Sequence, residues 1–270
     1  MRNNFFIFIF IFFIFSEYSF AEKFKFETSE IKILDEGNII YAKDGMAISS
    51  NNEVKIKAKK FEYNENLEIL KAFDGIAFLK SNNLQINFGE IKLDQKKLII
   101  TARQNVVINE IDKELSINTE SIIYDRSLNI LESNTKSMIN DKFNNKFSVD
   151  KFEYKIKDNI LKVQNGIFQD KENNSINLDL AYINTLSNKL LGKDVFINLN
   201  NKSFNEGNEP RLKGKSLIYQ NDKLEITKGV FTTCKKNGKC PPWQLVAEKI
   251  QHDKKKKLLV IKMLGLKFMM

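Results

Sequence analysis

The chain has 270 residues, with 43 Lys and Arg against 34 Asp and Glu and a net charge of +9. Only four of the basic residues are arginine, and the lysines alternate with acids and asparagines along the chain. A nucleic-acid binder needs basic residues gathered on one face with aromatic residues between them, so we predict no nucleic-acid partner. The length suits one large all-β unit or two small domains.

The first 21 residues have the layout of a secretory signal peptide. Arg2 supplies a positive charge, residues 5–15 form an unbroken apolar run, and Ser19 and Ala21 are the small residues of a cleavage site. The run is shorter than the roughly 18 residues expected of a membrane-spanning helix. We predict that residues 1–21 direct export and are removed; an anchor that is never cut is the alternative.

A repeat of about 30 residues follows the predicted signal peptide. Its anchor position holds large apolar or aromatic residues, and the same holds for columns seven and two residues before it. The anchor residues are Tyr63, Leu93, Tyr124, Tyr154, Ile183 and Tyr219. A single unit of this size cannot bury its apolar face, but copies stacked edge to edge can.

Each repeat reads as two or three short antiparallel strands. Apolar and polar residues alternate, which predicts strands with one buried and one wet face. The alternation slips by one residue between Ala58 and Phe61 and at the same place in the next copies, which predicts a β-bulge or corner. No proline occurs before Pro210, so nothing blocks a hydrogen-bonded ladder in this stretch. The predicted fold class is all-β, with stacked short strands around an apolar interior.

Two forms of that interior are compatible with the sequence. If the two walls of each unit close, the interior is a filled core; if they stay splayed, it is an apolar groove. The inward positions predicted to line it are Ile56, Phe61, Tyr63, Ile86, Phe88, Ile91, Ile117, Ile122, Tyr124, Phe147, Val149, Phe152, Tyr154, Ile176 and Leu178.

Residues for catalysis, cofactors or metals are missing from the pattern. The single histidine, His252, lies beside Asp253 in a lysine-rich stretch outside the repeats, and no Gly-rich phosphate loop occurs. A hydrolase would need a nucleophile next to a base, so we predict a protein that is not an enzyme and has no cofactor. Cys234 and Cys240 are predicted to form one disulfide; a metal pair with His252 is the alternative, although it leaves a zinc site incomplete.

The segment at 228–253, KGVFTTCKKNGKCPPWQLVAEKIQHD, resembles the junction segment of the LptD/OstA family of lipopolysaccharide-assembly proteins. The matching residues are Gly229, Phe231, Thr232, Thr233, Cys234, Pro241, Pro242, Trp243, Leu245, Ala247, Ile250 and Asp253. Residues 22–228 resemble the family's periplasmic OstA/LptA-like repeats. The resemblance implies a folded-over sheet, a β-jellyroll or "β-taco".

The family's function supplies the expected ligand and location. The resemblance implies that the fifteen inward residues form a groove for the acyl chains of lipopolysaccharide. It also implies a location in the periplasm, associated with the outer membrane, and stacking of sheet edges against other Lpt-type proteins. Burial of an acyl chain is worth about 0.8 kcal/mol per CH₂ group, so such a groove needs no special chemistry.

The end of the chain departs from the family. Residues 229–257 would lead into an outer-membrane barrel, and Cys234 would join a disulfide with it, but Cys240 offers a local partner. Residues 258–270 do not match the expected continuation; a reading-frame slip in the codons of 254–257 would explain them. A free-standing LptA-like bridge and a structural β-solenoid with a filled core and no ligand are the alternatives.

Overall fold

The computed structural model describes residues 23–169, 174–199, 207–221, 223–235, 243–253, 256 and 258–268. Nearly all of them are in β-strands, so the predicted all-β fold class is confirmed. The predicted signal peptide and Cys240 lie outside the described residues.

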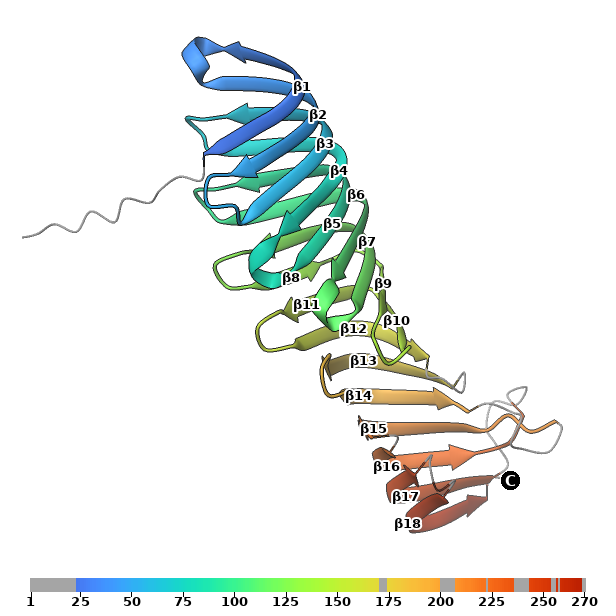
Figure 1. Cartoon of the computed structure of the whole chain (residues 1–270). Helices are drawn as coiled ribbons and strands as arrows, with labels where there is room; N and C mark the ends of the chain where they lie inside the picture. Colours follow the sequence, from blue (N-terminus) through green and yellow to red (C-terminus); the bar gives the residue numbers. More distant parts are fainter. Residues whose placement is uncertain are drawn as a thin grey trace, which may run out of the picture.

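The strands follow one another along a single long axis, with β1 at one end and β18 at the other (Figure 1). Three single 3-10 turns, which the sequence patterns did not predict, connect strands: η1 (Asp35–Gly37), η2 (Lys80–Asn82) and η3 (Ile111–Lys113). The strands are β1 (Phe24–Leu34), β2 (Ile39–Ser49), β3 (Val54–Asn64), β4 (Ile69–Leu79), β5 (Leu84–Asp94), β6 (Ile99–Glu110), β7 (Leu115–Asp125), β8 (Ile130–Ser133), β9 (Ser137–Asn140), β10 (Lys146–Val149), β11 (Lys151–Lys155), β12 (Ile160–Gln169), β13 (Ser175–Asn184), β14 (Lys189–Asn198), β15 (Arg211–Gln220), β16 (Lys223–Thr232), β17 (Trp243–Asp253) and β18 (Leu258–Phe268).

Consecutive strands pair antiparallel from β1 to β7 and from β12 to β18. Between these runs, two strands are each broken into halves. β8 and β9 both pair with β7, and β11 and β10 both pair with β12. The halves also pair with each other across the break, β8 with β11 and β9 with β10. The sheet is therefore one meander whose middle strands are interrupted.

Most strands bend at their midpoint, where the sequence predicted a slip in the alternation. In β3 the buried residues run Val54, Ile56 and Ala58, then resume at Phe61 and Tyr63. The next strands slip in the same way, and the pairing of β5 with β6 shifts register between Asn87 and Glu90. In β3 itself the register with β4 is unchanged, with Ala58 opposite Gly75 and Lys60 opposite Phe73, so the slip between Ala58 and Phe61 marks a corner, the second of the two predicted forms.

The bends turn the sheet into two facing walls. The first wall holds the strand halves around Ile56, Ile86 and Ile117, and the second wall holds those around Phe61, Ile91 and Ile122. On alternate strands the bend carries a residue with a left-handed backbone (positive φ), a conformation that Asn, Asp and Gly adopt most easily. These residues are Asp44, Asp74, Gln104, Asn105, Asn165, Asp194 and Lys228.

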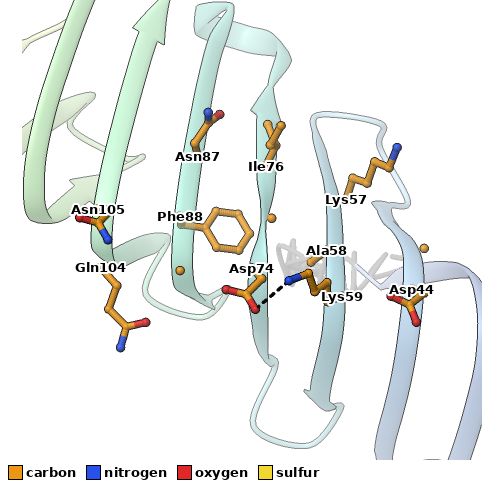
Figure 2. Close-up of a pocket in the computed structure, with 13 residues that line it drawn as sticks. Asp44, Lys57, Ala58, Lys59, Asp74, Ile76, Asn87, Phe88, Gln104 and Asn105 are labelled. Atoms are coloured by element: carbon orange, nitrogen blue, oxygen red, sulfur yellow. Dashed lines mark hydrogen bonds and ion pairs between the residues drawn. The ribbon is translucent and has the colours of Figure 1, made fainter.

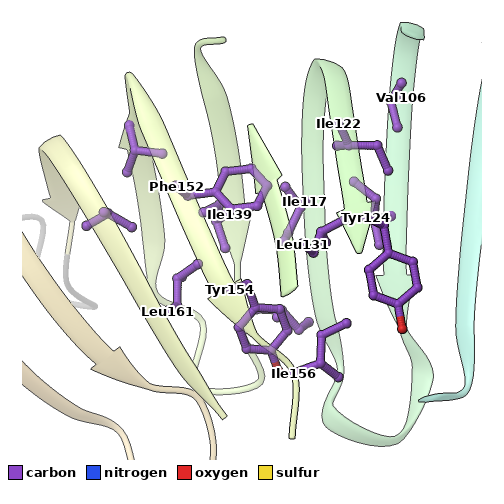
Figure 3. Close-up of a cluster of buried hydrophobic side chains, with 14 of the residues drawn as sticks. Val106, Ile117, Ile122, Tyr124, Leu131, Ile139, Phe152, Tyr154, Ile156 and Leu161 are labelled. Carbon is purple, nitrogen blue, oxygen red and sulfur yellow. The ribbon is translucent and has the colours of Figure 1, made fainter. Parts of the chain in front are cut away.

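The walls enclose one apolar core. Figure 3 shows its middle part, where Ile117, Ile139, Phe152 and Leu161 meet between the strands. Along one inward row, large and small side chains alternate across neighbouring strands. This row runs Ile31, Ala42, Phe61, Ala72, Ile91, Ala102 and Ile122. The small residues leave room for the large ones on the neighbouring strands.

The strands also continue through the predicted junction and tail. β16 and β17 pair across Gly229 and Ala247, and β18 pairs with β17 up to Phe268. The boundaries predicted after residues 228 and 257 therefore coincide with no break in the sheet.

Candidate functional site

The interior is the candidate site, and all fifteen predicted inward residues lie in it. None of them is more than 5% exposed, and Ile56, Ile86 and Ile91 are fully buried. The prediction was anchored on alternate strands and missed the inward residues of the strands between them. Some of those residues are small, such as Ala47, Ala72, Ala77 and Ala102, and others are large, such as Leu70 and Ile100. Their own alternation was the signal that could have found them.

The two walls touch each other across the interior. At the β1 end, the ring of Phe26 from the first wall lies 5.8 Å from that of Phe61 in the second, in an edge-on arrangement. Farther along, the rings of Phe168 and Tyr219 lie 6.0 Å apart between the walls. The sequence left a filled core and a splayed groove open; the interior is filled by the chain's own side chains.

One polar cluster interrupts the apolar interior. Thr119, Ser133, Thr135 and Ser137 bring four hydroxyl groups together at the break between β8 and β9. Their oxygen atoms lie 2.9–3.0 Å apart, and Ser137 also donates to the carbonyl oxygen of Thr135. Because buried hydroxyl groups cost free energy unless they are hydrogen-bonded, this mutual pairing lets the middle strands break inside the core.

The long side opposite the bends is where the free ends of the two walls meet, and we call it the seam. The turns after β2, β4, β6 and β9 form the rim of the first wall; the turns after β1, β3, β5, β7, β11 and β13 form the rim of the second wall. Polar contacts join the rims. Lys23 pairs with Glu65 at 2.9 Å, Asn82 donates to Asn129 at 3.0 Å, and Asn145 donates to the side-chain oxygen of Asn188 at 2.9 Å.

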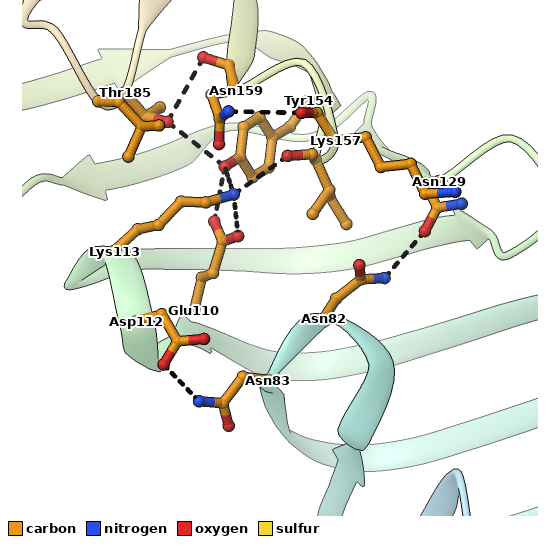
Figure 4. Close-up of polar contacts among 12 residues, drawn as sticks. Asn82, Asn83, Glu110, Asp112, Lys113, Asn129, Tyr154, Lys157, Asn159 and Thr185 are labelled. Carbon is orange, nitrogen blue, oxygen red and sulfur yellow. Dashed lines mark hydrogen bonds and ion pairs between the residues drawn. The ribbon is translucent and has the colours of Figure 1, made fainter.

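The most buried rim contact involves Glu110, Lys113 and Tyr154. Glu110 and Lys113 form an ion pair on the first rim, and the Tyr154 hydroxyl donates to Glu110 at 2.6 Å from the second wall (Figure 4). Lys113 also donates to the carbonyl oxygen of Ile156 at 3.0 Å. Burial, with the hydrogen bond to Glu110, raises the pKa of Tyr154 well above its usual value. The Tyr154 hydroxyl therefore stays protonated at every physiological pH and remains a hydrogen-bond donor to Glu110.

Two of the hollows in the described part of the chain bear on access to the interior. One, of about 370 Å³, is on the seam, and its lining includes Asn82, Lys113 and Asn159. The other, of about 830 Å³, lies at the bends of β2–β6, where Lys59 and Asp74 form an ion pair at 3.5 Å (Figure 2).

At the hollow of the bends, the core comes close to the surface. Phe88 and Ala58 line this hollow, and at 5% and 6% exposure they are the most exposed of the buried apolar residues in β3 and β5. Polar side chains surround them, among them Asp44, Lys57 and Asn87. The hollow thus offers an apolar floor with a charged border.

The described part of the C-terminal segment contributes packing contacts. The Sγ atom of Cys234 lies 3.9 Å from the carbonyl oxygen of Trp243, and the centre of the Trp243 ring lies 6.2 Å from that of Phe231. The disulfide with Cys240 stays a prediction, because Cys240 lies outside the described residues. Across the described parts of the chain, no three His, Cys, Asp or Glu side chains come together as metal ligands.

No helix in the described segments is long and apolar enough to cross a membrane. A scan of protein-family models and a search of curated proteins find no match to this chain.

Proposed function

We propose that this protein carries the acyl chains of lipopolysaccharide along its interior, in the periplasm, as an LptD/OstA-like module of outer-membrane assembly. One observation carries the proposal. The inward rows form a single apolar interior that runs from Phe24 in β1 to Ile250 in β17. An elongated apolar interior suits an extended acyl chain, because each buried CH₂ group contributes about 0.8 kcal/mol.

The two ends of the sheet support the second part of the proposal, stacking against other Lpt-type proteins. In the described residues, β1 pairs only with β2 and β18 only with β17. At the β1 end, the inward-row residues Ile31 and Ile33 are 53% and 57% exposed. A strand added there would extend both the ladder and the apolar interior.

A structural β-solenoid without a ligand is the second candidate, and the filled core favours it. With Ile56, Ile86 and Ile91 fully buried, an acyl chain can enter only if side chains move or the walls part. The lipid-carrying proposal therefore requires an interior that opens, whereas a purely structural role does not.

Photocrosslinking from matched positions separates the two candidates. A photoreactive residue would replace buried Ile86, Ile117 or Phe147 or, as controls, outward Ile123 or Met138, which are 41% and 45% exposed. We expect crosslinks to purified lipopolysaccharide from the three inward positions and not from the controls. Crosslinks from none of the inward positions, or equally from the controls, would favour the structural role.

A further inference from the structure

The seam contains a charged pair in a row that holds leucine on both neighbouring strands. Glu110 lies opposite Leu84 on β5 and Leu115 on β7. At the equivalent position of the repeat stand Leu79 one copy earlier, Ser49 two copies earlier and Asp141 one copy later. Glu110 is nevertheless 3% exposed. A leucine would fit this row, so the carboxylate is a departure that packing alone does not require.

A buried ion pair adds little net stability, because both charges lose their hydration. Replacing such a pair with apolar residues of similar size is often neutral or stabilising. When the rims part, however, Glu110 and Lys113 return to water and regain that hydration, whereas two leucines would be exposed at a cost. The pair thus lowers the free energy needed to open the seam at this point.

The sheet is also interrupted beside this pair. Tyr154, which bonds Glu110 from the second wall, lies on β11, one half of a broken strand. The neighbouring strand is broken as well, between Ser133 and Ser137, at the buried hydroxyl cluster. Where the strands are broken, fewer ladder hydrogen bonds resist a change in the angle between the walls.

We propose that Glu110, Lys113 and Tyr154 form a latch, and that the walls part at this latch by pivoting at the broken strands β8–β11. The seam hollow, lined in part by Glu110, Lys113 and Ile156, lies at the same place. Opening exposes the middle of the core, including Ile139. Entry of an acyl chain through this opening rests on the proposed function; the opening itself does not.

Thiol labelling of a buried cysteine measures the opening without any lipid. The background is the full chain with Cys234→Ser and Cys240→Ser, and the probe is Ile139→Cys, fully buried between the broken strands. A second probe, Ile56→Cys, is equally buried but lies outside the broken strands and reports unfolding elsewhere. Each probe is combined with the intact latch, with the apolar latch Glu110→Leu/Lys113→Met/Tyr154→Phe, in which no buried hydroxyl is left without its partner, or with Tyr154→Phe alone.

With the apolar latch, we expect Ile139→Cys to be labelled about tenfold more slowly, because opening then exposes apolar side chains in place of charges that regain hydration. With Tyr154→Phe, which removes the bond between the walls, we expect faster labelling. Labelling at Ile56→Cys should change less in both cases. Equal labelling of Ile139→Cys in all three latch forms, or parallel changes at both probes, would overturn the latch.

Uptake of a fluorescent fatty acid by the same three latch forms then tests the link to lipid. If the seam opens as expected and no form takes up the fatty acid, the latch stands and the lipid-carrying proposal fails. If the fatty acid is taken up equally by forms whose labelling differs, acyl chains enter elsewhere.

Discussion

Tyr63 and Tyr154 occupy equivalent positions of the repeat, yet their hydroxyl groups have different surroundings. The Tyr63 hydroxyl is buried without a hydrogen-bond partner, whereas the Tyr154 hydroxyl donates to Glu110. Both positions belong to the repeat anchor that the sequence revealed, and both were predicted to face inward. Their partners could not be predicted, because Glu110 lies 44 residues from Tyr154 in the chain and meets it only across the seam.

The Tyr63→Phe and Tyr154→Phe substitutions should therefore change the free energy of unfolding by different amounts or in opposite directions. We expect Tyr63→Phe to leave the free energy of unfolding unchanged or to raise it by up to about 1 kcal/mol, since an unsatisfied buried hydroxyl is removed. Tyr154→Phe should lower it by about 1.5–3 kcal/mol, because a hydrogen bond to a charged group is lost. Urea unfolding at neutral pH measures both, and equal losses would contradict the assignment.

Tyr63 also predicts a loss of stability at high pH. Burial, with the negative charges of Glu65 and Glu68, raises its pKa to about 12, against about 10 in an unfolded chain. Between these values the unfolded state releases the proton first, so the free energy of unfolding falls as pH rises from about 10 to about 12. Urea unfolding across this range should show a shallower fall in Tyr63→Phe; an unchanged slope would refute the shift.

At the scale of single strands, the bend is the feature that the sequence predicted best. The slip in alternation between Ala58 and Phe61 located it, because a strand's side-chain period is fixed by its pleat. The broken strands were not foreseen, since the alternation slips between Val149 and Phe152 just as it does at the bends of unbroken strands. The sequence left open whether the walls close, because closure depends on contacts between turns far apart in the chain.

Gly75 allows the tight bend of β4. A Cβ atom added there would lie 2.2 Å from the backbone oxygen of Lys57, whereas one added at Gly265 in β18 would meet nothing within 4 Å. We expect Gly75→Ala to lower the free energy of unfolding by about 1–3 kcal/mol, because backbone must shift. Gly265→Ala should change it by less than about 0.5 kcal/mol. Similar values in urea unfolding would show that the bend is not tight.

At the scale of the molecule, the stack has a protected middle and less protected ends. β5 pairs on both sides and its inward residues are buried, whereas β18 pairs only with β17 in the described chain. On β18, Leu258, Val260, Leu264 and Leu266 are 49–68% exposed. The repeat spacing predicted this nearest-neighbour architecture, because each unit can bury its face only against the next.

Amide hydrogen exchange should reflect that gradient. We expect amides of β18 to exchange first and those of β5 last, because strands paired on one side open locally with less free energy. Exchange followed by mass spectrometry on the intact chain resolves the two strands. Equal protection of β18 and β5 would mean that the sheet opens only as a whole.

The alternation of large and small residues in the row of Phe61 restricts which insertions and deletions the sheet can accommodate during evolution. Duplicating a single strand would set two bulky rows side by side, as if Phe61 faced a second phenylalanine in place of Ala72. It would also place the turn that follows on the rim of the other wall. Gain or loss of a whole hairpin pair keeps both the alternation of this row and the rim, and such a pair is the step of about 30 residues seen in the sequence.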